Sequence, residues 1–179
     1  MLSAKGLISI QKGKGIFVMP PSSDHVISSM KYYLFANGHV DDPLTILEAR
    51  LIIEPTIAEY AAIYHDDNDL KLLQANYDEM KKNTDKDRHA HLDIEFHHLI
   101  AESTKNPIMP LILNPIHSLM PKIKSKIMAA VPNAKEAAIV WHLKVLEAIK
   151  SSDSNLARDT MKQHLLVAKE HTEQMLNEQ

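Results

Sequence analysis

The residues best suited to chemistry lie between His91 and Pro107, in the sequence HLDIEFHHLIAESTKNP. If this stretch is helical, Asp93 and His97 share a face, because positions i and i+4 of a helix are one turn apart. Both then fall near the middle of a broad apolar arc, whereas His98 falls on the opposite side. A carboxylate and an imidazole buried together need a polar partner, because an unpaired buried charge is costly. The partner is the other member of the pair, an arginine or a metal ion.

Two more histidines fall on the apolar faces of the last two predicted helices. The spacing predicts a helix over 134–150 with His142 at the centre of its apolar face, and a final helix with His164 at the centre of its own. The turn at 151–154 separates them, with Asp153 as the N-cap. His142 lies about ten residues before this turn and His164 about eleven after it. At about 1.5 Å of rise per residue, an antiparallel pair places both histidines at one height.

These positions form a candidate metal site. Its members, drawn from three predicted helices, are Asp93, His97, His142 and His164. One inward histidine is more often a packed core residue than a ligand, but three with an aspartate are harder to explain by packing. Imidazole and carboxylate suit Zn²⁺, Ni²⁺, Mn²⁺ or Fe²⁺, and helical bundles build such sites from facing helices. His171 shares the face of His164 and is the main rival for the last ligand position.

An inward arginine is a candidate anion-binding group. Arg50 lies within the apolar arc of a helix predicted for about 43–65. A buried guanidinium needs an anion, and the structural partners are Glu54 at i+4 or Asp93. The functional partner is a ligand carboxylate, which a guanidinium grips through two parallel hydrogen bonds.

Composition narrows the class of protein. The chain has 179 residues, enough for one well-buried domain, and a formal net charge of −3, which argues against a general polyanion-binding surface. It contains no cysteine, so disulfides, thiolate metal sites and cysteine nucleophiles are excluded. This usage fits a reducing, cytoplasmic location. No apolar run reaches the ~18 residues of a membrane span, so no membrane partner is expected.

The chain divides into a short hairpin and a long helical part. Two strands are predicted over 6–11 and 16–18 around a glycine-containing basic turn, and Pro20-Pro21 ends this unit. From residue 22 onward the periodicity is helical, with segments over about 24–37, 43–65, 66–84, 91–105, 134–150 and 154 onward. Three prolines should bend or divide the segment 108–130.

Several groups of residues follow one another in a recognisable order. They are Glu48-Ala49-Arg50 with Glu54-Pro55, Asp93-Ile94-Glu95-Phe96-His97, Asn106-Pro107, and His142, Asp153 and His164-Leu165. In this order they resemble the C-terminal ligand-sensing domain of GntR-type transcriptional regulators of the FadR-like branch, called the FCD domain. The resemblance extends from Val26 to the end of the chain.

The resemblance implies an all-α fold over 22–179, an antiparallel bundle of six or seven helices. It also implies that this domain senses a small organic acid at a divalent metal and that the protein is a homodimer and not an enzyme. In metal-containing members an aspartate, a histidine four residues later and two further histidines hold the ion. The matching residues are Asp93, His97, His142 and His164, with Arg50 and Asn106 as effector contacts.

Residues 1–21 resemble the β-wing that ends the family's winged helix-turn-helix domain. The helix that would enter the major groove has no counterpart, so the chain is expected to begin inside the DNA-binding domain. Lys12 and Lys14 are the candidate phosphate contacts, but two lysines do not provide base readout. The chain alone is therefore expected to bind no operator with useful affinity, and control of DNA binding belongs to the full-length protein.

Two other functions compete with the sensor. A metal with Asp and His ligands can activate water, and His65-Asp66 invites comparison with helical phosphohydrolases that carry an HD pair. That pair lies at a helix end, away from the inward residues. Alternatively, Asp93 and the histidines form only a buried polar network in a structural helical module. The stability of such a module would not change when a chelator is added.

Overall fold

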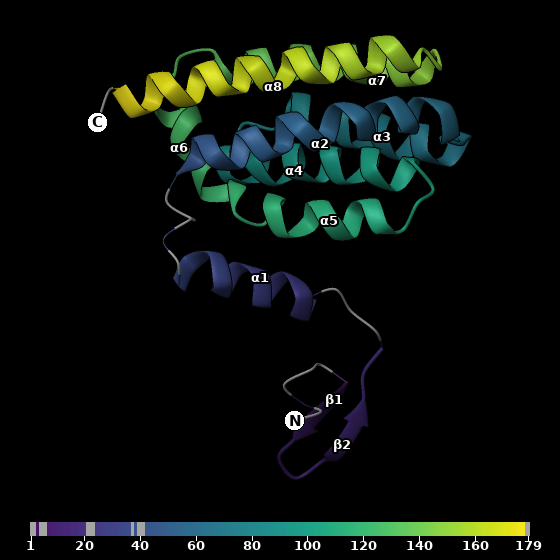
Figure 1. The fold of residues 1–179 in the computed structure, drawn as a ribbon, viewed down its shortest axis with the longest axis vertical. Helices are drawn as coiled ribbons and strands as arrows, with labels where there is room; N and C mark the ends of the chain where they lie inside the picture. The colour runs from purple at the N-terminus through teal and green to yellow at the C-terminus, as the bar shows by residue number, and fades with distance from the viewer. Residues whose placement is uncertain (1–2, 4–6, 21–23, 37, 39–41, 178–179) are drawn as a thin grey trace.

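The computed structural model describes residues 3, 7–20, 24–36, 38 and 42–177 (Figure 1). The predicted strand start at residue 6 and helix end at residue 37 lie outside these residues. The elements are β1 (Ile8–Gln11), β2 (Gly15–Val18), α1 (Asp24–Ala36), α2 (Pro43–Tyr64), α3 (Asp67–Lys82), α4 (Lys86–Ser103), α5 (Ile108–His117), α6 (Met120–Ala130), α7 (Ala134–Lys150) and α8 (Ser154–Asn177). The all-α prediction is confirmed, with α2 to α8 forming the bundle.

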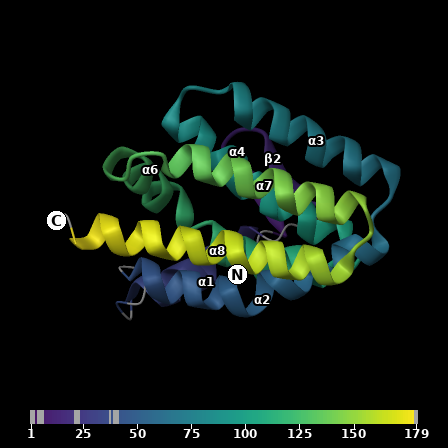
Figure 2. The same cartoon turned by 90° about the horizontal axis from the view of Figure 1, so that it is seen from above.

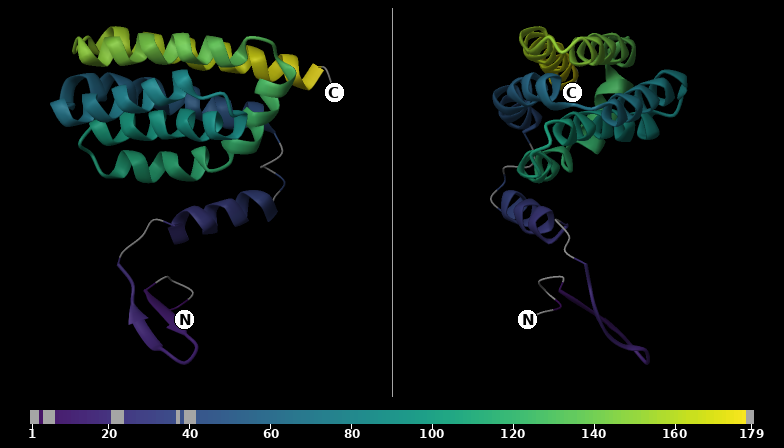
Figure 3. Two further views of the ribbon diagram at one scale, coloured as in Figure 1. Left: turned by 180° about the vertical axis from the view of Figure 1, so that it is seen from behind. Right: turned by 90° about the vertical axis from the view of Figure 1, so that its right-hand side faces the viewer.

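The bundle is layered around α2 and α4. An antiparallel pair, α7 and α8, lies on one side and α5 on the other, while α6 crosses at one end (Figures 1 and 3). Figure 2 shows α8 flanked by α7 and by α2, and both helices pack against it. The main apolar core lies between α2, α3, α4, α7 and α8. No helix in the described part of the chain is both long and apolar enough to cross a membrane.

Short acidic caps fix where the bundle helices begin. Asp42 accepts a hydrogen bond from the Leu44 backbone N–H and precedes α2. Asp66 and Asp69 form a reciprocal capping box at the start of α3. Asp153 accepts from the Leu156 N–H and opens α8, as predicted. Side-chain oxygens of this kind satisfy backbone donors that have no partner within the helix.

The central helix α4 begins earlier than the sequence pattern suggested. Asp85 accepts from the Arg88 N–H, and the helix runs from Lys86 to Ser103. A helix counted from His91 omits its first turns. The correction matters because His89 then lies one turn before Asp93 on the same face.

The proline-rich segment is divided, as predicted. The helices α5 and α6 are separated at Ser118-Leu119, a short step that lies between prolines and not at one. Pro115 lies inside α5, and Pro121 lies in the first turn of α6, where its missing N–H costs nothing. The division turns α6 across the end of the bundle and directs Lys124 inward.

The N-terminal elements form an arm beside the bundle. The strands pair antiparallel, with Ile8 opposite Val18, and Gly13 and Gly15 take positive φ in the turn. Helix α1 has no buried residue among those described and packs mainly against α5, on the bundle side farthest from α8 (Figure 1). The arm thus adds little to the core.

Candidate metal centre

Asp93, His97, His142 and His164 converge at the centre of the bundle. One ligand atom from each lies within 4.8 Å of the others, and all four residues are buried. Nε2 of His97 lies 3.4 Å from Nε2 of His142 and 3.2 Å from Nε2 of His164. Oδ1 of Asp93 lies 3.6 Å from Nε2 of His142. The predicted convergence is observed, and the role of these residues as metal ligands stays a prediction.

The helical hairpin explains how two of the histidines meet. The ring centroids of His142 on α7 and His164 on α8 lie 4.5 Å apart. Each residue is a similar number of residues from the turn between the helices, so the rise per residue places them level. Phe96 packs against His142 with a centroid separation of 4.6 Å and closes the apolar side. The register argument is confirmed.

His97 is oriented by groups on α2. Its Nδ1 lies 2.5 Å from Oε2 of Glu54, and its Nε2 lies 3.2 Å from Nη2 of Arg50. A carboxylate only accepts hydrogen bonds and a guanidinium only donates them. The Arg50 contact therefore places the lone pair of His97 on Nε2, the nitrogen that faces the other histidines, and the proton on Nδ1, beside the Glu54 carboxylate. A carboxylate behind a ligating imidazole is the usual arrangement at metal sites.

Burial sets the protonation states in this cluster. Loss of solvent holds the pKa of His142 and that of His164 well below the ordinary value, so both are neutral at pH 7. Burial alone would raise the pKa of Asp93, but the adjacent Lys124 ammonium holds it well below its usual range. An ionised carboxylate beside neutral imidazoles is the state in which these groups bind a metal.

The donor set fits a divalent transition metal. Three imidazole nitrogens and a carboxylate are ligands that Zn²⁺, Ni²⁺, Mn²⁺ and Fe²⁺ accept. Bonds of about 2.1 Å at tetrahedral angles place neighbouring donors about 3.4 Å apart. The nitrogen separations of 3.2 and 3.4 Å around His97 agree with this spacing. Further support comes from Nδ1 of His142, which lies 3.1 Å from the Met80 sulfur, a weak acceptor that favours a lone pair on Nε2.

A second buried network supports the first, and only its Arg50–Glu54 pair was anticipated from the sequence. Glu54 contacts Arg50 Nε at 2.5 Å and His117 Nε2 at 2.8 Å, in addition to His97. Burial would raise the pKa of Glu54, but Arg50 and the two histidines hold it well below the ordinary value. Burial lowers the pKa of His117 to about 4. The sequence signal was limited to Glu54 at i+4 from Arg50, since His117 lies 63 residues away.

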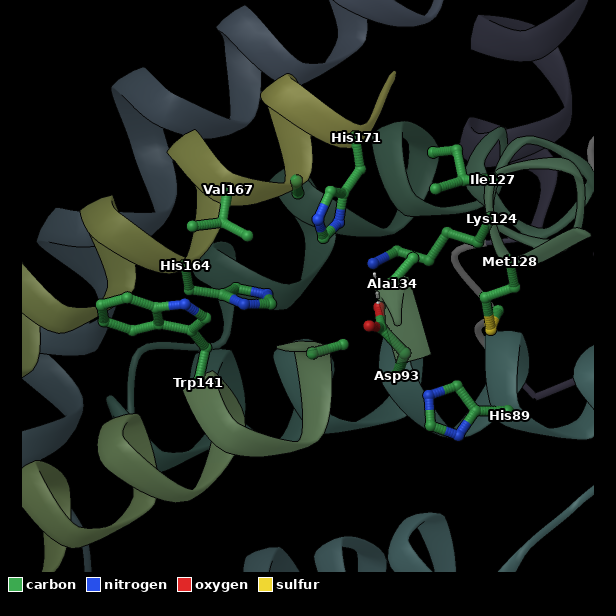
Figure 4. A pocket seen from close by; sticks show the side chains of 12 residues that line it. His89, Asp93, Lys124, Ile127, Met128, Ala134, Trp141, His164, Val167 and His171 are labelled. Carbon is green, nitrogen blue, oxygen red and sulfur yellow. Dashed lines mark ion pairs between the residues drawn. The ribbon is translucent and has the colours of Figure 1, made fainter. Parts of the chain in front are cut away.

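A cavity opens on the other side of Asp93 (Figure 4). Its empty volume is about 460 Å³, including solvent at its mouth. Its lining residues are His89, Asp93, Lys124, Ile127, Met128, Ala134, Ala138, Trp141, His164, Val167, Ala168 and His171. Two members of the candidate metal centre thus face open space. A small molecule in this cavity would lie against the metal position.

Lys124 is the functional candidate that sequence analysis missed. Its Nζ lies 2.5 Å from Oδ2 of Asp93, and its side chain is only 10% exposed. Burial lowers its pKa, and Asp93 opposes that shift. Lysines at 122, 124 and 126 alternate along α6, so no local pattern marks the inward one. Only the crossing of α6 over α4 brings it to the site.

The structure places the remaining residues predicted to contact effector, metal or DNA in several separate regions. Arg50 takes the structural partner considered above, Glu54, and also reaches His97. Asn106 is exposed, its Oδ1 accepts from the Ile108 N–H, and it is not among the cavity residues. His171 lines the cavity outside the four-residue cluster. The exposed side chains of Lys12 and Lys14 lie at the hairpin turn. Effector contact by Arg50 or Asn106 stays a prediction.

The His65-Asp66 pair has a structural explanation. His65 is the C-cap of α2 and Asp66 is the N-cap of α3. Asp66 also pairs with Lys105 at 2.6 Å, and this ion pair with its hydrogen bonds lowers the pKa of Asp66 to about 2. Neither residue belongs to the buried cluster. The pair joins two helices, which leaves the hydrolase hypothesis without this support.

Comparison with known proteins agrees with this architecture. Residues 45–166 match the family model described as the FCD domain. The chain is 26% identical over 161 residues to the galactonate operon transcriptional repressor of Escherichia coli K12, covering 87% of this chain and 69% of the repressor. It is 28% identical over 178 residues to the Uxu operon regulator of Haemophilus influenzae, covering 92% and 62%. The structure of Streptococcus agalactiae GntR matches with a TM-score of 0.70 at 20% identity, covering 94% of this chain and 77% of that one.

The chain therefore belongs to the FCD family, as the ligand-sensing part of a GntR-type regulator. The curated relatives named above are transcriptional regulators and not enzymes. The matched part of the chain spans 69% and 62% of the lengths of the two curated relatives named above. At 20% identity, the structural match supports a shared fold and nothing further.

Proposed function

We propose that the chain senses a small organic acid at a divalent metal and thereby controls DNA binding by a full-length, homodimeric, cytoplasmic regulator. Asp93, His97, His142 and His164 would hold the ion. The observation that carries this proposal is the convergence of the three Nε2 atoms and one carboxylate among buried residues. Bound metal supplies a Lewis acid that attracts an anionic oxygen.

The surrounding residues support a ligand and not a closed structural site. The cavity reaches Asp93 and His164 from one side, so an effector can approach the metal position without unfolding the bundle. Arg50 approaches from the other side, and its Nη1 has no hydrogen-bond partner among the described residues. A guanidinium with a free edge suits a carboxylate oxygen. We assign Arg50 as one effector contact on this basis.

The relatives favour an acid as the effector. One is named for the galactonate operon, and galactonate is a hydroxylated carboxylate. The hairpin would serve as a wing in the complete DNA-binding domain, with Lys12 and Lys14 on phosphates. Effector binding at the α4, α7 and α8 contact would change how the bundle presents that domain, by favouring one of two arrangements.

A thermal-shift screen tests the proposal. Protein loaded with Zn²⁺ and protein treated with EDTA are heated with acetate, lactate, malate or galactonate. The proposal predicts that at least one acid raises the melting temperature of the zinc-loaded protein and has no such effect after EDTA. Equal responses with and without metal would contradict it, as would no response to any of the four.

A further inference from the structure

The most unusual charged group in the cavity is Lys124. It is the only lysine or arginine among the described lining residues. Its side chain is only 10% exposed. Figure 4 shows its side chain extending from α6 toward Asp93, with the ammonium beside the Asp93 carboxylate. A buried ammonium is costly unless it is paired, and here Asp93 is its one acidic partner in the lining.

Metal binding would change that pairing. Asp93 Oδ2 lies 2.5 Å from Lys124, and the same carboxylate belongs to the candidate metal centre. A divalent ion adds two positive charges, while Asp93 supplies one negative charge and Lys124 adds one positive charge. Arg50 and Glu54 cancel each other on the far side. The loaded cavity would therefore hold an excess of two positive charges, which a dianion would balance and a monoanion would reduce to one.

The lining also limits the kind of anion. Trp141, Met128 and Val167 give apolar walls for a short carbon skeleton. His89 is buried and lines the cavity, and neither ring nitrogen makes a well-formed hydrogen bond within the described residues. A neutral imidazole offers one donor and one acceptor, which suits a hydroxyl group. The polar lining groups His89 and Lys124 thus lie near Asp93, beside the metal position.

We infer that Lys124 is the effector-anchoring cation of this cavity and that the effector is a short acid with a second oxygen function, a hydroxy acid or a dicarboxylate. One oxygen group of the effector lies on the metal side, beside Asp93 and His164, and the other pairs with the Lys124 ammonium. The inference rests on the proposed function, because it requires the metal and an acid. It adds the residue that selects the acid. That residue is Lys124 on α6, in addition to Arg50, the effector contact expected from the sequence.

The test compares lysine variants of α6. The zinc-loaded protein is titrated calorimetrically with whichever of acetate, lactate, malate and galactonate binds most tightly. Lys124→Met keeps the length of the side chain and removes its charge, and Lys124→Gln also keeps a donor toward Asp93. Lys126→Met changes an exposed lysine of the same helix and is the matched control. Zinc content is measured in each variant, so that loss of metal is not mistaken for loss of the acid.

The expected result is a dissociation constant raised about tenfold or more in both Lys124 variants, because a hydrogen-bonded charge pair is lost, and raised less than about twofold in Lys126→Met. Acetate should bind more weakly than lactate or malate in the parent. If Lys124→Met does not fold, Lys124→Gln decides the question. Parent-like affinity in a zinc-loaded Lys124 variant would overturn this inference and leave the proposed function intact. Failure of the zinc-loaded parent to bind any of the acids would overturn both.

Discussion

The bundle and the N-terminal arm distribute polar and apolar groups in opposite ways. At the centre of the bundle, Arg50, Glu54 and His97 are at most 2% exposed. In the arm, Tyr32 is 75% exposed, Phe35 71% and Val18 88%. Folding usually buries the apolar groups and leaves charges in water, so each region departs from the usual pattern. The departure at the bundle centre is accompanied by close pairing of every charge.

The two regions therefore contribute differently to the protein. A buried polar cluster is costly and is retained where its groups act together, and here they converge at ligand spacing beside a cavity. The exposed apolar residues of α1 and the hairpin contribute little to the stability of the bundle. Stability and ligand chemistry should therefore depend on α2, α4, α7 and α8, while changes in the arm leave both nearly unchanged.

The largest effect is expected from a matched pair of phenylalanines. Phe96 is fully buried against His142, whereas Phe35 is 71% exposed on α1. Phe96→Ala should lower the free energy of unfolding by about 3–5 kcal/mol, because it removes core contacts and leaves a cavity. Phe35→Ala should change it by less than about 0.5 kcal/mol. Urea denaturation followed by circular dichroism measures both, and equal losses would erase the contrast between the regions.

The next effect concerns the charge that supports His97. Glu54→Gln removes the carboxylate that pairs with Arg50 and His117 and leaves a buried guanidinium unpaired. The expected loss is about 3 kcal/mol in urea denaturation at pH 7. Glu48→Gln is the control, since Glu48 is an exposed residue of the same helix that makes a surface contact of 3.4 Å with Lys169. A Glu54→Gln protein as stable as the control would show that the network contributes no stability.

A smaller effect follows from the pH dependence of His117. Burial lowers its pKa from 6.5 to about 4, against the opposing influence of Glu54, while Arg50 and His97 add to the lowering. Between these values the unfolded state binds more protons than the folded state, so the free energy of unfolding should fall as pH decreases from 6.5 to about 4. His142 and His164 shift in the same direction.

Urea titrations in EDTA between pH 7 and pH 4.5 measure this dependence. His117→Gln should make the decline with falling pH shallower than in the parent, because one depressed group is removed. His91→Gln, which changes an exposed histidine of α4, should leave the decline unchanged. The same slope in all three proteins would contradict a neutral, buried His117.

Short-range sequence patterns predicted much of the fold. Contacts between residues far apart in the sequence could not be predicted from such patterns. The cap at Asp153 and the spacing of His142 and His164 are short-range features, so they were sufficient to align the two histidines. The start of α4 was misplaced because charged residues in its first turn hid the periodicity. Lys124 could not be distinguished from its neighbouring lysines, since its burial depends on how α6 crosses α4. The pairing of Glu54 with His117 likewise depends on tertiary packing across 63 residues.

The smallest effect tests the junction between the arm and the bundle. Asp42 accepts from the Leu44 N–H at 3.0 Å and from the Thr45 hydroxyl at 2.6 Å. Asp42→Ala should cost about 1 kcal/mol, because it removes the N-cap of α2. Asp42→Asn keeps a side-chain acceptor and should retain most of that stability. If the two variants lose stability equally, capping is not the role of Asp42.

The most direct test of the central claim is the metal content of the protein purified without a histidine tag or added metal. We predict close to one Zn, Ni, Mn or Fe ion per chain by elemental analysis, and none in Asp93→Ala or His142→Ala. His91→Ala, an exposed histidine of α4, should keep the parent's content. Absence of metal from the parent, even after reconstitution with each of the four ions, would contradict a metal centre and reduce the cluster to a buried polar network.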